Sequence, residues 1–391
     1  MKQSDVTLVI PGYNNLRHLK NCYASIKKHA KDIKLILLDD GSTDGTIDWL
    51  YSLKDPNITS IYRSEDRIGH TILYDKGIDL AETEIVGIFH CDMIMGPNYI
   101  ENVLKHLSKK VVVAGTRIEP PLHPPGNEKI IQNFGIDFDD LNIPAFEEFC
   151  IRQEEINKDE TSRGMFAPWI IYKEDFLSVG GHDHIFAPFP YEDSDIFERW
   201  ILSGYKLIQS RDAFVYHLTC RGHRYTEQIG KDDDYFKNAS QRAAREYLRK
   251  WGSWIKNDEF QHPIIKPKYN IGFVVKNCTL QAMAFLEPIC TTIYVEDQSI
   301  IDDYFKYEQP NTNFNLHERI ALTSAEKNND ILIEFDFKKL TQDHTSIVQQ
   351  FPEIIKDSGR IGYLELDEFK LTITSMKTYE SDMIQPMKKY I

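Results

Sequence analysis

The sequence lacks a regular cysteine pattern. Its six cysteines are irregularly spaced and none forms a Cys-x-x-Cys pair, which argues against a disulfide framework. We therefore expect free thiols in a reducing compartment, and we predict a cytoplasmic location.

Long apolar runs are missing too. No stretch approaches the roughly 20 apolar residues that span a bilayer. The first residues are polar, unlike those of a secretory signal peptide. We expect no transmembrane segment.

Positive charge is scarce. The chain has 46 Lys and Arg against 60 Asp and Glu, a formal net charge of -14. This balance argues against nonspecific binding to nucleic acid or to an anionic membrane. It remains compatible with a local electropositive pocket for a diphosphate.

Two glycine-rich phosphate-binding motifs are absent as well. No G-x-G-x-x-G follows the first predicted strand, and no G-x-x-x-x-G-K-[ST] occurs. A Rossmann dehydrogenase and a P-loop NTPase are therefore both disfavoured.

What the chain does contain is an alternation of short apolar runs and amphipathic stretches. Strands are predicted over residues 6–10, 34–38, 58–62 and 85–89, and helices over residues 16–29, 46–53 and 71–81. This alternation predicts an α/β fold with a mostly parallel sheet and right-handed crossovers.

Acidic side chains follow two of these strands. The second strand ends on Asp39 and Asp40, and the fourth ends on His90-Cys91-Asp92. Ligands of open α/β sheets bind outside the carboxyl ends of the strands. Asp92 is a hard oxygen donor suited to Mg²⁺ or Mn²⁺ carrying a diphosphate, although a polar turn after a strand is the simpler reading of this stretch alone.

Three motifs together resemble one known family. They are Pro11-Gly12-Tyr13-Asn14, Leu38-Asp39-Asp40-Gly41-Ser42-Thr43-Asp44 and His90-Cys91-Asp92, each following a predicted strand. This arrangement is similar to that of the inverting family 2 glycosyltransferases, which have the GT-A fold. The resemblance covers roughly residues 5–255.

The resemblance implies roles for the matching residues. Tyr13, with Pro11 beside it, would stack on the nucleotide base, and Asp40, preceded by Asp39, would hold that base. Asp92 would bind the metal. His90 departs from the family's usual Asp, and could instead contact ribose or phosphate or ligate the metal. A second departure is Asp75, where many relatives have Asn.

The acceptor side resembles the same family. Gly180-Gly181-His182-Asp183 is followed by Tyr191-Glu192-Asp193-Ser194-Asp195, and the resemblance makes Asp193 the general base with Glu192 as the fallback. The residues alone also allow a purely structural role, because acidic side chains are favoured in the first turn of a helix and Asp195 can form an ion pair with Arg199 one turn later.

A predicted strand over residues 213–216 ends on His217. The resemblance implies that this histidine completes the metal site, whereas a lone His after a strand is more often structural. Residues 218–225 contain Arg221, His223 and Arg224, and we expect this segment to close on the diphosphate.

The expected organisation is a GT-A domain over residues 1–255, a linker over 256–269 and a smaller α/β domain over 270–391. The second domain carries no motif that we recognise. Residues 119–127 are rich in proline and residues 128–160 are polar and acidic. We assign no role to that insertion.

The predicted function is metal-dependent, inverting transfer of a sugar from a nucleotide sugar to a hydroxyl of a glycan or other acceptor, with a UDP sugar as the expected donor and Mn²⁺ or Mg²⁺ as the expected metal. Three alternatives stay open. A sugar-phosphate nucleotidylyltransferase would need a Gly-rich, basic first loop that is missing here, and a glycosidase would need neither the metal nor Asp40. The third is a noncatalytic sugar-nucleotide or glycan-binding module, which only His90 favours.

Overall fold

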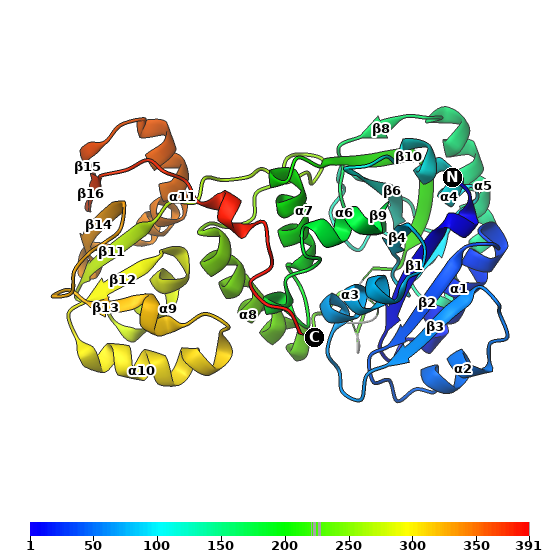
Figure 1. Cartoon of the computed structure of the whole chain (residues 1–391), viewed down its shortest axis with the longest axis horizontal. Coiled ribbons are helices and arrows are strands. Elements are labelled where there is room, and N and C mark those ends of the chain that lie inside the picture. The colour runs from blue at the N-terminus through cyan, green and yellow to red at the C-terminus, as the bar shows by residue number, and fades with distance from the viewer. Residues whose placement is uncertain (220, 222–223, 226–227, 391) are drawn as a thin grey trace. The chain divides into compact units, whose positions relative to one another are not determined.

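The computed structural model describes residues 1–219, 221, 224–225 and 228–390. They form two compact units, each with its own sheet (Figure 1). The first contains Met1–Ala239, Asn257–Pro263 and Gln385–Ile391, and the second contains Ser240–Lys256 and Ile264–Ile384. Part of the segment predicted as a linker, and the last residues of the chain, therefore fold with the first unit.

A mixed, mostly parallel sheet forms the first unit, in agreement with the predicted fold class. Its strands, in spatial order, are β3 (Ile58–Arg63), β2 (Lys34–Asp39), β1 (Val6–Gly12), β4 (Ile85–Ile88), β9 (Trp169–Tyr172), β6 (Val111–Glu119), β10 (Lys206–His217) and β5 (Met93–Met95), with β7 (Lys129–Ile131) beside β6 and β8 (Thr161–Ser162) beside β10. Strands β3, β2, β1 and β4 are parallel, whereas β9 runs antiparallel to both of its neighbours.

Helices cover both faces of this sheet. They are α1 (Leu16–His29), α2 (Thr46–Ser52), α3 (His70–Leu80), α4 (Tyr99–His106), α5 (Ile143–Ile156), α6 (Lys173–Ser178) and α7 (Glu192–Leu202). A further helix, α8 (Asp234–Trp251), begins in the first unit and continues into the second. Leu19 of α1 packs in one core with Leu8 of β1, and Leu73 of α3 packs in another core with Val9. Successive strand residues point to opposite faces, so α1 and α3 lie on opposite sides of β1.

The strand registers bring three polar strand ends together. Gly12 at the end of β1 pairs with Asp39, and Val9 pairs with Ile88 two residues before His90. His217 at the end of β10 pairs antiparallel with Met93. This last pairing sets His217 beside the His90–Asp92 turn, although Asp92 and His217 are 125 positions apart in the sequence.

The polar insertion to which we assigned no role packs around β10. It contributes β7 and α5, and Phe146 and Cys150 of α5 pack in one core with Phe214 and Tyr216. The insertion therefore buttresses the strand that carries His217.

A six-stranded sheet forms the second unit. Its spatial order is β13 (Ile320–Leu322), β12 (Thr292–Val295), β11 (Ile271–Lys276), β14 (Ile331–Asp336), β16 (Phe369–Ile373) and β15 (Gly362–Leu366), and its helices are α9 (Leu280–Leu286), α10 (Gln298–Glu308) and α11 (Gln342–Ser358). Phe273, Ile333 and Phe351 belong to its core. A smaller C-terminal α/β unit was predicted; the short strand β13 was not.

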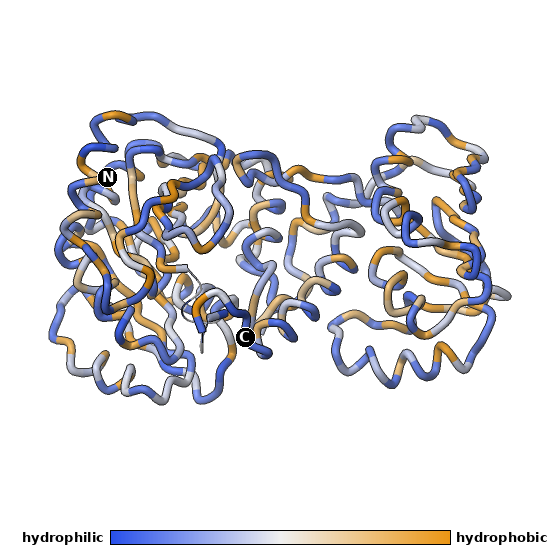
Figure 2. The backbone as a smooth tube through the Cα atoms, turned by 180° about the vertical axis from the view of Figure 1, so that it is seen from behind, coloured by the Kyte–Doolittle hydropathy of each residue, from blue (hydrophilic) through white to orange (hydrophobic). Residues whose placement is uncertain are grey.

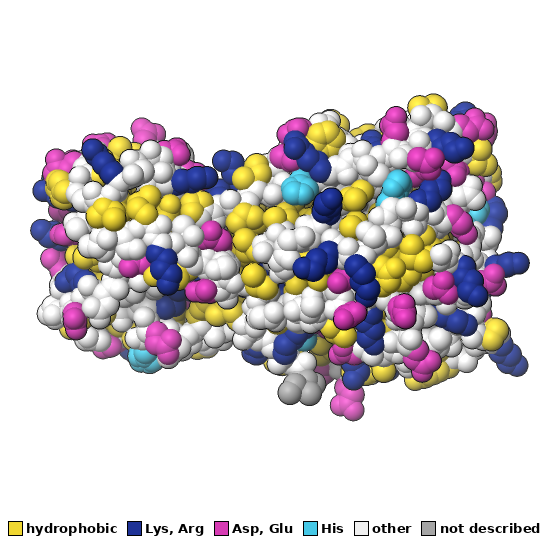
Figure 3. All heavy atoms as spheres, turned by 45° about the horizontal axis from the view of Figure 1, so that its top comes forward, with side chains coloured by type: hydrophobic (Ala, Val, Ile, Leu, Met, Phe, Trp, Pro, Cys, Tyr) yellow, Lys and Arg dark blue, Asp and Glu magenta, His cyan; other side chains and the backbone are white. Residues whose placement is uncertain are grey.

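Hydropathy and charge follow this architecture. Apolar stretches lie along the strands within each unit, and polar stretches dominate the connections (Figure 2). On the face drawn in Figure 3, acidic and basic side chains are interspersed. Within the described residues, no helix is both long and apolar enough to cross a membrane.

Candidate functional site

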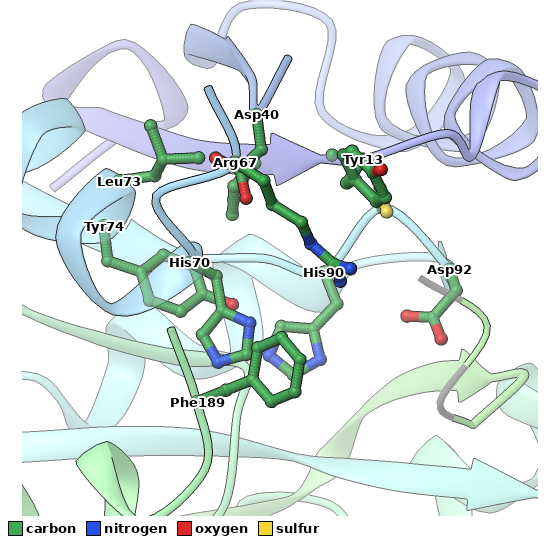
Figure 4. Close-up of a pocket in the computed structure, with 12 residues that line it drawn as sticks. Tyr13, Asp40, Arg67, His70, Leu73, Tyr74, His90, Asp92 and Phe189 are labelled. Carbon is green, nitrogen blue, oxygen red and sulfur yellow. The ribbon is translucent and has the colours of Figure 1, made fainter. Parts of the chain in front are cut away.

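A pocket lies at the carboxyl ends of β1, β2 and β4 in the first unit (Figure 4). Its lining comes from the loop after β1, the end of β2, the loop before α3, α3 itself, the turn after β4 and one residue before α7. The lining residues are Pro11, Gly12, Tyr13, Asp40, Arg67, His70, Leu73, Tyr74, His90, Cys91, Asp92 and Phe189. The fold thus gathers five of the residues singled out in the sequence: Pro11, Tyr13, Asp40, His90 and Asp92.

Asp40 is buried and also holds the loop that leads into α3. Its Oδ1 accepts hydrogen bonds from the amide of Ile68 (2.7 Å) and the hydroxyl of Ser64 (3.3 Å), and its Oδ2 accepts from the amide of Gly69 (3.0 Å). Burial raises the pKa of Asp40, and the two amides and the charge of Arg67 offset part of that rise. Each carboxylate oxygen has two lone pairs, so Oδ2 retains capacity for one more donor.

Asp39 is fully buried and does not line the pocket. Its Oδ1 accepts from the amide of Ser42 (3.1 Å), and its Oδ2 lies 3.2 Å from Nη1 of Arg63. Here the carboxylate stabilises the Asp-Gly-Ser turn. Its predicted contact with a nucleotide stays a prediction.

Arg67 reaches into the pocket, and sequence reasoning missed it. Its guanidinium carbon lies 4.0 Å from the ring centroid of Tyr13, 4.3 Å from that of Tyr235 and 5.5 Å from that of Phe189. Figure 4 shows the side chain extending between Tyr13 and His90. Such stacking holds a guanidinium in place, so the pocket contains a fixed positive charge in an otherwise acidic protein.

His90, Asp92 and His217 form a group that could hold a metal ion. Each offers one ligand atom, and these atoms lie within 4.8 Å of one another. The Nε2 atom of His217 is 3.6 Å from Oδ1 of Asp92. Two imidazoles and a carboxylate fit a divalent cation such as Mn²⁺. With His90 in place of the usual Asp, three donor groups for a cation therefore still lie close together.

Glu119 orients His217, and nothing in the local sequence marked it. Its Oε1 lies 3.0 Å from Nδ1 of His217, which directs Nε2 of that ring toward Asp92. Burial would raise the pKa of Glu119, but Arg117 (2.9 Å), His217 and Lys129 (3.0 Å) together hold that pKa well below its ordinary range. Glu119 is thus an ionised carboxylate, the usual partner of a metal-binding histidine.

The basic segment after β10 touches the metal group through its backbone. The amide of Leu218 donates to the main-chain oxygen of Asp92 at 3.1 Å. The amide of Arg221 donates to Oδ2 of the same residue, also at 3.1 Å. The Arg221 guanidinium donates to the carbonyl of Ile136, and Arg224 pairs with Asp232 at 2.5 Å. His223 lies outside the described residues. Contact of Arg221 and Arg224 with a diphosphate stays a prediction.

The two candidate bases differ in their partners. Glu192 is buried, and its Oε1 lies 2.7 Å from Nε2 of His70, a pocket residue. Burial would raise the pKa of Glu192, but the charge and the hydrogen bond of His70 lower it. Asp193 accepts from the amide of Ser194 (2.6 Å), and burial together with the charge of Glu192 raises its pKa to about 6.

Tyr74 contacts both His70, the partner of Glu192, and His90 of the candidate metal-binding group. Burial, and then the charges of Glu192, Cys91 and Asp92, raise the pKa of Tyr74 well above its ordinary value. Its ring stacks on His90 at 6.3 Å and lies 5.3 Å from His70. The candidate base and the metal group therefore surround one aromatic side chain.

The sheet order, with acidic and histidine side chains at the strand ends, defines a GT-A-type α/β fold. Residues 7–168 match the family model of glycosyl transferase family 2, so this region is a glycosyl transferase family 2 domain.

Two curated relatives are similar over part of the chain. A validoxylamine A glucosyltransferase of Streptomyces hygroscopicus subsp. jinggangensis is 24% identical over 238 residues, 54% of each chain. The glycosyltransferase GlyG of Streptococcus pneumoniae serotype 4 is 32% identical over 108 residues, 27% of this chain and 36% of that protein. The chain thus spans about half, or less, of the length of these relatives.

Solved structures share part of the architecture. One is GalNAc-T7 with UDP, GalNAc and Mn²⁺, with 16% identity, a TM-score of 0.44, and coverage of 63% of this chain and 49% of that one. Another is the mannosyltransferase PcManGT of Pyrobaculum calidifontis with GDP-Man and Mn²⁺, with 16% identity, a TM-score of 0.40, and coverage of 62% and 61%.

Proposed function

We propose that this protein is a metal-dependent, inverting glycosyltransferase that moves a sugar from a nucleotide sugar, specifically a UDP sugar, to an acceptor hydroxyl. The observation that carries the proposal is one constellation in a family 2 domain. The pocket contains His90 and Asp92, which form one group with His217, and it also contains His70, which is paired with Glu192, the residue before Asp193.

The donor would bind with its base against Tyr13 and Asp40. A uracil presents one ring N–H, which matches the remaining acceptor capacity of Oδ2 of Asp40. Arg67 stacks on Tyr13, so it would rearrange or contact the nucleotide's phosphates on binding. The positive charge of Arg67 favours an anionic nucleotide over a neutral sugar.

His90, Asp92 and His217 would hold Mn²⁺ or Mg²⁺. A bound divalent cation neutralises the charge that develops on the departing nucleoside diphosphate. Glu119 keeps His217 in the tautomer with a free Nε2, and the amide of Arg221 fixes the orientation of Asp92. These contacts leave the ligand atoms little freedom to move.

Asp193 would act as the general base. It accepts the proton of the acceptor hydroxyl while that oxygen bonds to the anomeric carbon, and the bond from this carbon to the diphosphate oxygen breaks. One displacement inverts the anomeric configuration and needs no enzyme nucleophile. A pKa near 6 suits a base that is ionised at neutral pH yet basic enough to take the proton. Glu192 is less suitable because it is paired with His70.

The main rival is a noncatalytic module of the same fold. The argument for such a module is that His90 stands where the family usually has an acid. The grouping of His90 with Asp92 and His217 weakens that argument, because the histidine can itself serve as a metal ligand. A nucleotidylyltransferase or a glycosidase is disfavoured by the family match.

The test is to incubate the protein with Mn²⁺ and a panel of nucleotide sugars, and to follow release of nucleoside diphosphate with and without candidate acceptors. We expect turnover of a UDP sugar that EDTA abolishes. Consumption of sugar 1-phosphate and nucleoside triphosphate would select the nucleotidylyltransferase instead. Tight donor binding without turnover would select the module, and either result would refute the proposal.

A further inference from the structure

Residues 385–390 lie along the turn formed by residues 180–184, two segments of the first unit that are far apart in the sequence. The amides of Met387 and Lys388 donate to the buried carboxylate of Asp183, at 2.8 and 3.1 Å. Backbone hydrogen bonds to a buried carboxylate are among the stronger polar contacts in proteins. This segment is therefore docked onto the turn.

The hydrogen bonds of His184 add to this contact and indicate which of its ring nitrogens carries the proton. Its amide donates to the carbonyl of Lys388 (3.0 Å), and the amide of Tyr390 donates to its Nδ1 (2.8 Å). A ring nitrogen that accepts a hydrogen bond carries no proton. His184 is thus a neutral imidazole that donates from Nε2 to Oδ2 of Asp75 at 3.1 Å.

Asp75 is the centre of this cluster. It is 6% exposed, it accepts from the amide (3.1 Å) and Nδ1 (2.7 Å) of His182, and the ammonium of Lys389 contacts its Oδ2. Burial would raise the pKa of Asp75, but the hydrogen bond and the charge of His182, the hydrogen bond from His184 and the charge of Lys389 hold that pKa far below its ordinary range. Lys389 is the permanent cation among these contacts.

Two glycines leave room for the docked segment. Gly181 has φ +70°, and a Cβ there would stand 2.8 Å from Oδ2 of Asp75 and 2.8 Å from Nζ of Lys389. Gly180 has φ +80°, and its Cβ would stand 2.5 Å from Cδ of Pro386. The turn thus matches this segment at two successive positions, in a backbone conformation that favours glycine.

The cluster is connected to the pocket. Asp75 follows Tyr74 on α3, and the hydroxyl of Thr71 on the same helix donates to the carbonyl of Pro188 at 3.0 Å. From the turn the chain runs directly to Phe189, which lines the pocket, and on to Asp193. A shift of the turn would therefore displace the acceptor side of the site.

We propose that Lys389 is a positioning residue: by balancing the buried charge of Asp75 it fixes residues 180–184, and through them it places Asp193 for transfer. The effect on transfer rests on the proposed function, whereas the effect on the turn does not. This segment, remote in sequence from every motif, is then part of the scaffold of the site.

The first test compares amide hydrogen exchange in peptides covering residues 178–193. Lys389→Met removes the ammonium that contacts the Asp75 carboxylate, and we expect exchange in these peptides to rise about tenfold, a moderate effect because His182 and His184 still bond to Asp75 and Lys389 is partly exposed. Lys389→Arg should keep protection. Lys388→Met is the matched control, since its ammonium lies over the ring of Tyr390 at 4.3 Å, and should also keep it.

A second variant checks the electrostatic cause. Adding Asp75→Asn to Lys389→Met removes the carboxylate charge that Lys389 no longer offsets, so exchange should be slower in the double variant than in Lys389→Met alone. Wild-type protection in Lys389→Met would overturn the proposal. So would equal losses in Lys389→Met and Lys389→Arg, because the charge would then be irrelevant.

Kinetics separate positioning from packing. We expect kcat for sugar transfer to fall about tenfold or more in Lys389→Met, with donor affinity changed less than about threefold, because a displaced base impairs the transition state and not donor binding. Unchanged kcat with faster exchange would reduce Lys389 to a packing role and overturn the proposal. If wild-type protein transfers no sugar from any donor, the proposed function fails while the exchange result still decides whether Lys389 fixes the turn.

Discussion

At the scale of single residues, the pKa of Asp193 predicts how the rate of transfer should depend on pH. Burial and the neighbouring charge of Glu192 raise the pKa of Asp193 to about 6. If Asp193 is the base, as we propose, it acts as the carboxylate, so transfer should be near maximal above that value and should fall about tenfold per pH unit below it. The measurement is log(kcat/KM) against pH. A limb near pH 4, the ordinary value for Asp, would contradict the environment described for Asp193.

Removal of that carboxylate should separate chemistry from binding. Asp193→Asn is nearly isosteric and should lower kcat by about two to four orders of magnitude, the usual contribution of a general base, with little change in donor affinity. Steady-state transfer and a donor titration check it.

Glu192→Gln is the matched control for Asp193→Asn. It loses the ion pair with His70 and should cost less in kcat. An inactive Glu192 variant beside a fully active Asp193 variant would assign the base to Glu192.

Glu119 offers a prediction that sequence motifs could not supply. Glu119→Gln keeps the size of the side chain but removes the charge beside Nδ1 of His217, and we expect Mn²⁺ affinity to fall about 10- to 100-fold. Mn²⁺ titration followed by electron paramagnetic resonance, with UDP present, measures this without turnover. Asp92→Ala should abolish metal-dependent UDP binding. Unchanged Mn²⁺ affinity in the Glu119 variant would mean that the ring of His217 needs no fixing.

At the scale of elements, the residue before α3 packs closely against the segment that leads into α7. Gly69 has φ +90° and ψ 156°, a conformation essentially restricted to glycine, and a Cβ there would stand 2.3 Å from Cα of Pro188. Gly69→Ala should destabilise the first unit by about 2–4 kcal/mol, from backbone strain and overpacking combined. Chemical denaturation measures the loss.

Gly204→Ala is the reference for that experiment. Gly204 also has positive φ (+79°), but nothing lies within 4 Å of its added Cβ. Its cost should be about 1–2 kcal/mol, the strain alone. Equal losses in the two variants would show that the contact with Pro188 is readily relieved.

At the scale of the whole molecule, each unit has a hydrophobic core of its own. Phe351 is buried against Phe273 and Phe369 in the second unit. Phe351→Ala should destabilise that unit by about 3–5 kcal/mol through the cavity it leaves. Amide exchange should rise in peptides of β11 while peptides of β1 keep their protection.

Tyr363→Ala is the control in the same unit, since Tyr363 is 57% exposed on β15, and it should cost less than about 0.5 kcal/mol. Equal loss of protection in β1 and β11 for Phe351→Ala would mean that the chain unfolds as one cooperative body.

The sequence by itself determined the elements and the local half of the site. Apolar periodicity set α1 at Leu16–His29, as predicted, and placed Pro11, Tyr13, Asp40 and Asp92 at strand ends. These predictions succeeded because parallel strands bring their carboxyl ends to one edge, so residues that follow the strands must meet. The local sequence pattern is enough to predict which side chains meet wherever strands that follow one another along the chain also lie side by side in the sheet.

Only the tertiary structure decided which distant side chains complete the site. The antiparallel pairing of His217 with Met93 brought that histidine to Asp92, and the pairing of β6 with β10 delivered Glu119 to it. Arg67, His70 and Lys389 carry no motif, and they matter through what they touch: Tyr13, Glu192 and Asp75. Asp39, adjacent to Asp40, is directed into the turn instead. Periodicity in one chain cannot specify these contacts, because strand order, register and side-chain direction arise from packing the whole core at once.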